Sequence, residues 1–140
     1  MADLNPPSST IPRPVFIVSD GTAITAETLA QAVLTQFPNL NYEQRRIPFV
    51  DTVEKAVATA DRINLVQEKT GMRPLVFSTF SRKSISNAFC DECTGFVSEL
   101  FRSFVNPLEE ELGMKSSHQV GMTHRIRNEE NYDRRIAAID

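Results

Sequence analysis

Residues 15–22 read Val15-Phe16-Ile17-Val18-Ser19-Asp20-Gly21-Thr22, a short apolar run of strand-forming residues that ends abruptly in small polar ones. Such a run predicts a buried β-strand followed by a tight loop. Apolar residues then recur at helical spacing, at Ala26, Leu29, Ala30, Val33 and Phe37. We therefore predict a strand, a loop and a helix from about Thr25 to Phe37, where Pro38-Asn39 closes the segment.

The same order of elements is repeated downstream. Residues 42–50 predict a second strand, which Pro48 confines to a sheet edge because proline has no N–H to donate. A helix follows Asp51-Thr52 and ends at Gly71, and residues 75–77 predict a third strand. Strands that alternate with helices pair in parallel through right-handed crossovers. We thus expect a three-layer, Rossmann-like α/β domain with a short parallel sheet, followed by helices, and a local strand order of 2-1-3.

After residue 81 the apolar pattern is helical. It forms one broad stripe of eight residues, namely Phe96, Val97, Leu100, Phe101, Phe104, Val105, Leu108 and Leu112. Asn106-Pro107 predicts a fresh helix start with Asn106 as its cap. So large a stripe on a short helix is also a candidate dimer surface.

Composition indicates one soluble globular domain, since 140 residues with 41% hydrophobic and 24% charged residues suit a single core. A net charge of −3 argues against nucleic-acid binding, and no apolar run is long enough for a membrane. The start, MADLNPPSSTIPRP, is no secretory signal, and with only two cysteines we expect a cytoplasmic protein. We predict a leader over 1–14, the α/β domain over 15–112, and a loop with the start of a helix over 113–140. Because the apolar face of that last helix, which opens at Tyr132, stops at Asp140, we expect the chain to be a piece of a longer one.

In an open parallel sheet, ligands bind beyond the carboxyl ends of the strands. Three predicted loops lie there, at 19–22, 51–52 and 78–84; two of them are rich in small hydrogen-bond donors, and the third loop adds two cations. The anion-binding candidates are Ser19, Asp20, Gly21, Thr22, Thr25, Arg82 and Lys83. The same residue types are also preferred by ordinary turns and helix caps. A purely structural role of these residues in turns and caps therefore stays open beside anion binding.

Other chemistries have weaker support. Asp20 could be a phospho-acceptor or, with Asp51, a cation ligand, but no further acid lies nearby. Cys90 and Cys93 form one C-x-x-C, which we interpret as two buried small apolar side chains on a helix, since the only histidines, His118 and His124, lie apart from it. A Ser19-Asp20-histidine triad has no elbow motif, and neither G-x-x-x-x-G-K-[ST] nor G-x-G-x-x-G occurs. No residue is therefore predicted to be catalytic or to ligate a metal.

Five stretches carry a resemblance to a known family, namely residues 15–29, 36–38, 48–50, 70–77 and 132–140. They resemble the amino-terminal portion of the phosphoenolpyruvate synthase regulatory protein family, whose relatives act on pyruvate, phosphate dikinase. The form Ser-Asp-Gly-Thr-Ala at residues 19–23 is more similar to the synthase branch. Residues 81–99, with both cysteines, match the family weakly.

The resemblance implies a bifunctional, nucleotide-binding transferase. Such an enzyme is a serine/threonine kinase that phosphorylates a threonine of its target with ADP as donor, and a phosphorylase that removes the group with phosphate and yields pyrophosphate. It also implies a P-loop and catalytic groups in a carboxyl-terminal domain beyond Asp140. We therefore expect ADP and phosphate to be substrates of the full-length enzyme, no cofactor to be essential for this fragment, and the fragment alone to be inactive. The expected partners are phosphoenolpyruvate synthase, or the dikinase, and a second copy in a homodimer.

Overall fold

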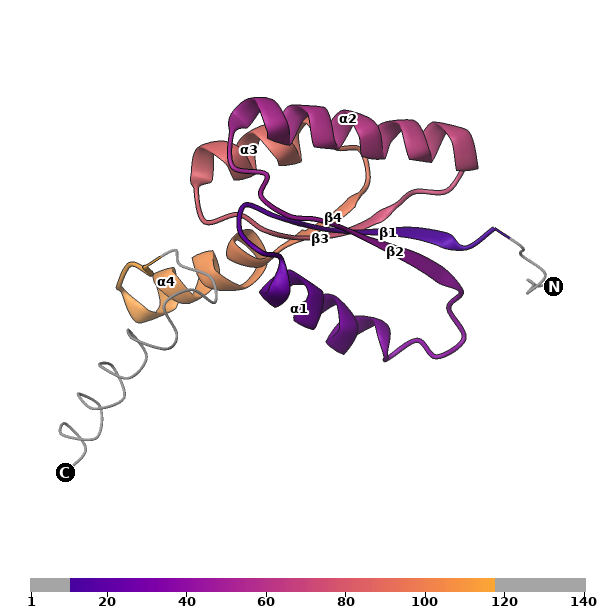
Figure 1. Cartoon of the computed structure of the whole chain (residues 1–140). Coiled ribbons are helices and arrows are strands. Elements are labelled where there is room, and N and C mark those ends of the chain that lie inside the picture. The colour runs from indigo at the N-terminus through magenta and orange to yellow at the C-terminus, as the bar shows by residue number, and fades with distance from the viewer. Residues whose placement is uncertain (1–10, 118–140) are drawn as a thin grey trace.

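A computed structural model describes residues 11–117 and shows a four-stranded parallel sheet with helices on both faces (Figure 1). The elements are β1 (Arg13–Ser19), α1 (Ile24–Leu34), β2 (Tyr42–Ile47), α2 (Val53–Thr70), β3 (Leu75–Thr79), α3 (Lys83–Glu92), β4 (Phe96–Glu99), the π-helix η1 (Phe101–Val105) and α4 (Asn106–Leu112). The strand order is β2-β1-β3-β4. The α/β fold and the order 2-1-3 are confirmed, with a fourth strand added beside β3.

Both ends of the chain extend past the described residues. The predicted loop and helix beyond residue 117 lie there, together with His118 and His124. At the amino end, β1 begins at Arg13, so the predicted leader over 1–14 overlaps the first strand by two residues. No helix within residues 11–117 is long and apolar enough to cross a membrane.

Strand β1 is one of the two central strands of the sheet, because both of its edges are paired. It aligns Phe16 with Arg45 of β2 on one side and with Val76 of β3 on the other. Strand β2 lies at the edge, as predicted, but it ends at Ile47, so Pro48 follows the strand instead of interrupting it. The missing N–H of Pro48 therefore helps to end β2.

Two apolar clusters sandwich the sheet. The cluster under α2 and α3 contains Phe16, Val18, Val50, Ala56, Ala60, Ile63, Val76, Phe80, Ile85 and Phe89. The cluster under α1 contains Val15, Ile17, Ala23, Ala26, Ala30, Leu34 and Phe77. Successive residues of β1 enter opposite clusters, as the two-residue period of a strand requires. The continuous apolar run in the sequence is thus explained by helices on both faces.

The segment after α3 corrects the predicted helical stripe. Phe96–Glu99 is strand β4, parallel to β3, and helical structure begins only after it. Asn106 does not cap a new helix, because it has helical dihedral angles and follows directly on η1. The eight stripe residues are therefore divided between a strand and a helix, and they do not share one face.

Two arginines tie the strands together at the amino end of the sheet. Arg13 Nε donates to the carbonyl oxygen of Arg73, at 2.7 Å. Arg73 donates in turn to the carbonyl oxygens of Thr94, at 3.1 Å, and Gly95, at 3.4 Å. These bonds join the starts of β1, β3 and β4.

Candidate functional site

The turns that follow β1, β2 and β3 meet at one edge of the sheet, which we call the rim. Thr79 Oγ1, at the end of β3, donates to Ser19 Oγ, at the end of β1, over 3.0 Å, and both residues are buried. After β2, the Phe49 and Val50 amides donate to the carbonyl oxygens of Gly21 and Ser19, each at 2.9 Å. The predicted convergence of the three loops is therefore confirmed.

Asp20 locks the first loop to the third. Its Oδ2 accepts hydrogen bonds from the backbone N–H and the hydroxyl of Ser81, both at 2.8 Å. The carboxylate thus occupies donors that a bound anion would otherwise take. Asp20 therefore has a structural role in this loop and does not fit the anion-binding interpretation: it is an internal hydrogen-bond acceptor at the turn into α3.

In the first loop, the residue with a left-handed backbone conformation is Ala23. Ala23 has a φ of 74°, is 2% exposed and precedes the first residue of α1. Gly21, which we expected to allow close approach, is not among the residues with positive φ, and a Cβ built on it would lie 3.8 Å from Ser19 Oγ. Thr22 Oγ1 is an acceptor at 3.5 Å from the Ile24 amide, a long contact. The start of α1 has no side-chain cap, and Thr25 lies half-buried in its first turn.

Cations border the second and third loops. Lys55 Nζ donates to Asp51 Oδ1 at 2.9 Å, and the hydroxyl of Thr52 caps α2 by accepting from the Lys55 amide at 3.1 Å. The hydrogen bond from Lys55 lowers the pKa of Asp51, and the charge of Arg82 acts in the same direction. Arg82 and Lys83 are both exposed at the start of α3, and α3 has no side-chain cap. The two candidate cations therefore belong to the same rim as Ser19.

Glu99 is a buried carboxylate that the sequence did not indicate as special. It is 2% exposed, at the end of β4. Its oxygens accept from the backbone amides of Phe80, at 3.2 Å, and Arg102, at 2.9 Å. Burial raises the pKa of Glu99, and the amide donors only partly oppose that shift. Glu99 thus joins the β3–α3 turn to η1, next to Lys83, with which it lines a small cavity of about 30 Å³.

The cysteines and acids do not assemble a metal site within residues 11–117. No group of three or more histidine, cysteine, aspartate or glutamate side chains is gathered in that part of the chain. Cys90 lies on α3 and Cys93 follows its last residue, and both thiols are partly buried against the core under α2 and α3. Burial raises the pKa of both thiols, which disfavours the reactive thiolate at neutral pH.

The chain is an open parallel α/β domain, and hydroxyl groups and cations lie at the turns from its strands to its helices. Domains of this class bind ligands at the carboxyl ends of their strands. The model of one particular family, described as Kinase/pyrophosphorylase, matches residues 15–140. The chain belongs to that family.

Curated relatives agree with this assignment. Proteins named "Putative phosphoenolpyruvate synthase regulatory protein" match from Stutzerimonas stutzeri, with 44% identity over 91% of this chain and 47% of the relative, and from Bordetella avium, with 44% identity over 95% and 48%. A third, from Paraburkholderia phytofirmans, is 46% identical over 93% of this chain and 47% of the relative. The chain spans about half the length of the curated relatives it matches.

Proposed function

We propose that this chain is part of a regulatory enzyme that controls phosphoenolpyruvate synthase by reversible phosphorylation of a threonine. The family match and the names of the relatives support a regulator with phosphotransferase chemistry. The threonine target and the use of ADP are the finer part of the proposal. We place this activity in the cytoplasm, a reducing compartment that suits the free thiols of Cys90 and Cys93.

The proposed cycle has two balanced steps. In the first, the target threonine hydroxyl attacks the β-phosphorus of ADP, the bond to the bridging oxygen breaks, and AMP leaves while the hydroxyl proton is released. In the second, inorganic phosphate attacks the phosphothreonine phosphorus, and pyrophosphate leaves with the threonine hydroxyl restored. Both steps place several negative charges in one site, so catalysis depends mainly on positioning and on cations.

Within this cycle we assign the rim an anion-binding role and no catalytic residue. The observation that carries this assignment is the junction of the three loops, in which Ser19 and Thr79 share a hydrogen bond. Around it lie the uncapped start of α1 and the exposed side chains of Arg82 and Lys83. Backbone amides at a helix start and guanidinium or ammonium groups are the donors that phosphate prefers.

Phosphoryl transfer is tested with ADP labelled in its β-phosphate and purified phosphoenolpyruvate synthase. We expect the full-length Bordetella avium relative to label a threonine of the synthase, and phosphate to release the label as pyrophosphate. We expect no labelling by the 140-residue chain alone. Labelling by this chain would contradict the expectation that the catalytic groups lie outside these 140 residues. Failure of the full-length relative to label the synthase would contradict the proposed reaction.

Anion binding is tested separately by calorimetry with ADP, AMP, phosphate and pyrophosphate. The chain should bind at least one of the four, and the double variant Arg82→Ala/Lys83→Ala should bind it at least tenfold more weakly. Lys69→Ala is the matched control, because Lys69 is exposed in the last turn of α2, at the other end of that helix from the rim. If none of the four ligands binds, the domain has no anion-binding role, and a docking scaffold is the function that remains.

A further inference from the structure

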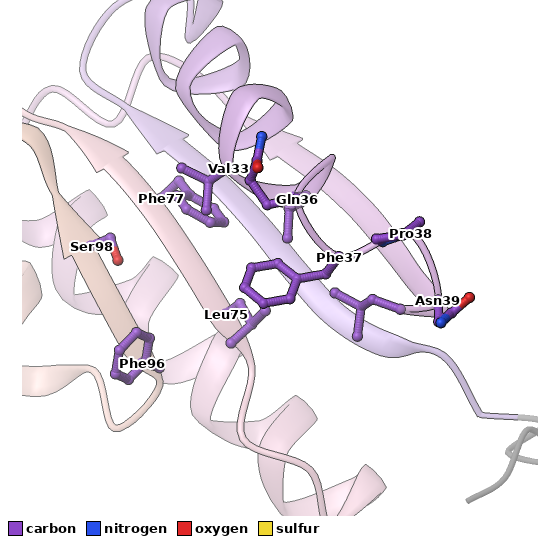
Figure 2. Close-up of a pocket in the computed structure, with 11 residues that line it drawn as sticks. Val33, Gln36, Phe37, Pro38, Asn39, Leu75, Phe77, Phe96 and Ser98 are labelled. Carbon is purple, nitrogen blue, oxygen red and sulfur yellow. The ribbon is translucent and has the colours of Figure 1, made fainter.

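An apolar groove lies on the α1 face of the sheet, at the starts of β3 and β4 (Figure 2). Its volume is about 670 Å³, and none of its lining residues is charged. Val33 and Phe37 line one side of the groove, and Leu75 and Phe96 line the other. Phe37 and Phe96 are 59% and 54% exposed, so two large apolar side chains are in contact with water here.

The groove exists because the two faces of the sheet are unequally covered. The apolar cluster on one face takes its helical residues from both α2 and α3, whereas the cluster on the other face takes them from α1. On that second face, Leu75 and Phe77 of β3 align with Phe96 and Ser98 of β4, and all four line the groove. Parallel sheets normally carry helices over both faces. Neighbouring helices pack about 8–10 Å apart, which is roughly two strand spacings, so the groove has the place of a second helix beside α1.

We propose that residues 132–140 of this chain form that second helix and lay its apolar side in the groove. These residues lie outside the described part of the chain, and their sequence predicts an amphipathic helix. Tyr132, Ile136 and Ile139 recur at spacings of four and three residues, which places them on one side of a helix. The inference goes beyond the regulatory chemistry and does not depend on it.

The chain between the two parts is long enough to make this contact. The described residues end at 117, and residues 118–131 connect them to Tyr132. At about 3.3–3.6 Å per residue, this connection can span up to roughly 50 Å. The longest strand, β1, has seven residues, which corresponds to roughly 23 Å. Residues 132–140 can therefore reach the amino end of the sheet, although α4 follows the carboxyl end of β4.

Charge favours one direction for the docked helix. Helix α1 runs from the rim to the amino end of the sheet, because it connects β1 to the parallel strand β2. A helix that runs alongside α1 in the same direction would end with Asp140 near Arg73. The Arg73 guanidinium lies 5.5 Å from the ring centroid of Phe96, at the edge of the groove. It would attract both the Asp140 carboxylate and the negative end of the helix dipole.

Disulfide trapping tests the proposal directly. In a chain with Cys90 and Cys93 replaced by Ala, Phe96→Cys places one thiol in the groove and Ile139→Cys places another in the docked segment. Glutathione disulfide should oxidise the two thiols to a disulfide within one chain. The matched control combines Ile139→Cys with Leu65→Cys, since Leu65 is 52% exposed on α2, on the opposite face of the sheet. The groove pair should form its bond about tenfold faster or more, because docking raises the effective concentration of the thiols.

The size of the denatured, unreduced product identifies the occupant of the groove. A disulfide within a single chain, formed faster by the groove pair, supports the proposal. A disulfide that joins two chains through the groove thiol would show that another copy fills the groove, and it would overturn the proposal. Equal behaviour of the groove pair and the control pair would overturn it as well, because the segment would then have no preferred face.

A second measurement needs no added thiol. Ile136→Glu places a charge on the apolar side of the segment, and it should lower the melting temperature of the 140-residue chain by roughly 5 °C. Ala137→Glu is the matched control, because residue 137 lies about 100° or more around the helix from the three apolar residues, and it should leave the melting temperature nearly unchanged. In a Phe96→Glu chain, whose groove is already charged, adding Ile136→Glu should have little further effect. Equal melting temperatures of the Ile136→Glu and unmodified chains would refute the docking, and so would losses that add fully in the double variant.

Discussion

Removing the Asp20 carboxylate gives the sharpest test of how the rim is held together. In Asp20→Ala, the Ser81 amide and hydroxyl both lose their acceptor. Hydrogen bonds to a charged group contribute about 1.5–3 kcal/mol each when buried and less when partly exposed. Asp20 is half-buried, so we expect a total loss of about 2–3 kcal/mol in the free energy of unfolding, which lowers the melting temperature by roughly 10 °C.

The assay is urea unfolding followed by circular dichroism, with two companion variants. Ser81→Ala removes only the hydroxyl donor and should cost about 1 kcal/mol. Asp20→Asn keeps a neutral oxygen acceptor and should fall between Asp20→Ala and the unmodified chain. The double variant Asp20→Ala/Ser81→Ala should lose about 1 kcal/mol less than the sum of the two single variants, because both single variants remove the same hydrogen bond. An Asp20→Ala chain within about 0.5 kcal/mol of the unmodified one would refute the reasoning.

Three further predictions concern other residues of the domain. Because burial raises the pKa of Glu99, the folded chain favours its protonated form, and that contribution is present below the unfolded pKa and lost as pH rises through the folded pKa. Glu99→Gln should therefore flatten the fall in melting temperature with rising pH, and an unchanged difference between the two chains from pH 4 to pH 7 would contradict this. Gly21→Ala should change stability by less than about 1 kcal/mol, whereas Gly95→Ala should cost about 1–3 kcal/mol, because its Cβ would lie 3.1 Å from the Pro74 carbonyl oxygen; equal losses in urea unfolding would show the reasoning to be wrong. Replacing Cys90 and Cys93 together by Ala should cost roughly 1–3 kcal/mol, and melting of the unmodified chain should be the same with zinc or with EDTA.

The alternation of strands and helices was predictable because it rests on local patterns. The run of residues 15–18 is apolar throughout, and burial on both faces requires that. Gly71 ends α2 with a φ of 73°, a conformation that glycine adopts without strain. Strand order was predicted from Pro48, which indicated an edge, and from the first strand being the most apolar. Because the strands are parallel, the meeting of their loops at the rim could be predicted as well.

Strand β4 could not be predicted from the local pattern. Phe96 and Val97 are followed by Leu100 and Phe101, a spacing that suits a helix as well as a strand. Residues 96–99 form a strand because they pair with β3, where Leu75 aligns with Phe96. The spacing of apolar residues along the sequence does not indicate that pairing. An apolar run of two residues is too short to decide between the two structures.

Details of the rim depend on contacts between distant segments. Asp20 and Ser81 are 61 residues apart, and Glu99 is 19 residues from the amide of Phe80. The sequence indicates that polar groups gather there but not which donor meets which acceptor. The left-handed conformation of Ala23 leaves no signal either, since alanine does not prefer it.

The two ends of the sheet are held together by side chains of opposite charge. At the amino end the donors are the guanidinium groups of Arg13 and Arg73, which bind backbone carbonyl oxygens. At the carboxyl end the acceptor between the loops is the carboxylate of Asp20. The two ends should consequently open independently. In Asp20→Ala, amide exchange should become faster in the turns after β1 and β3, while the amides at the starts of β1, β3 and β4 keep their protection.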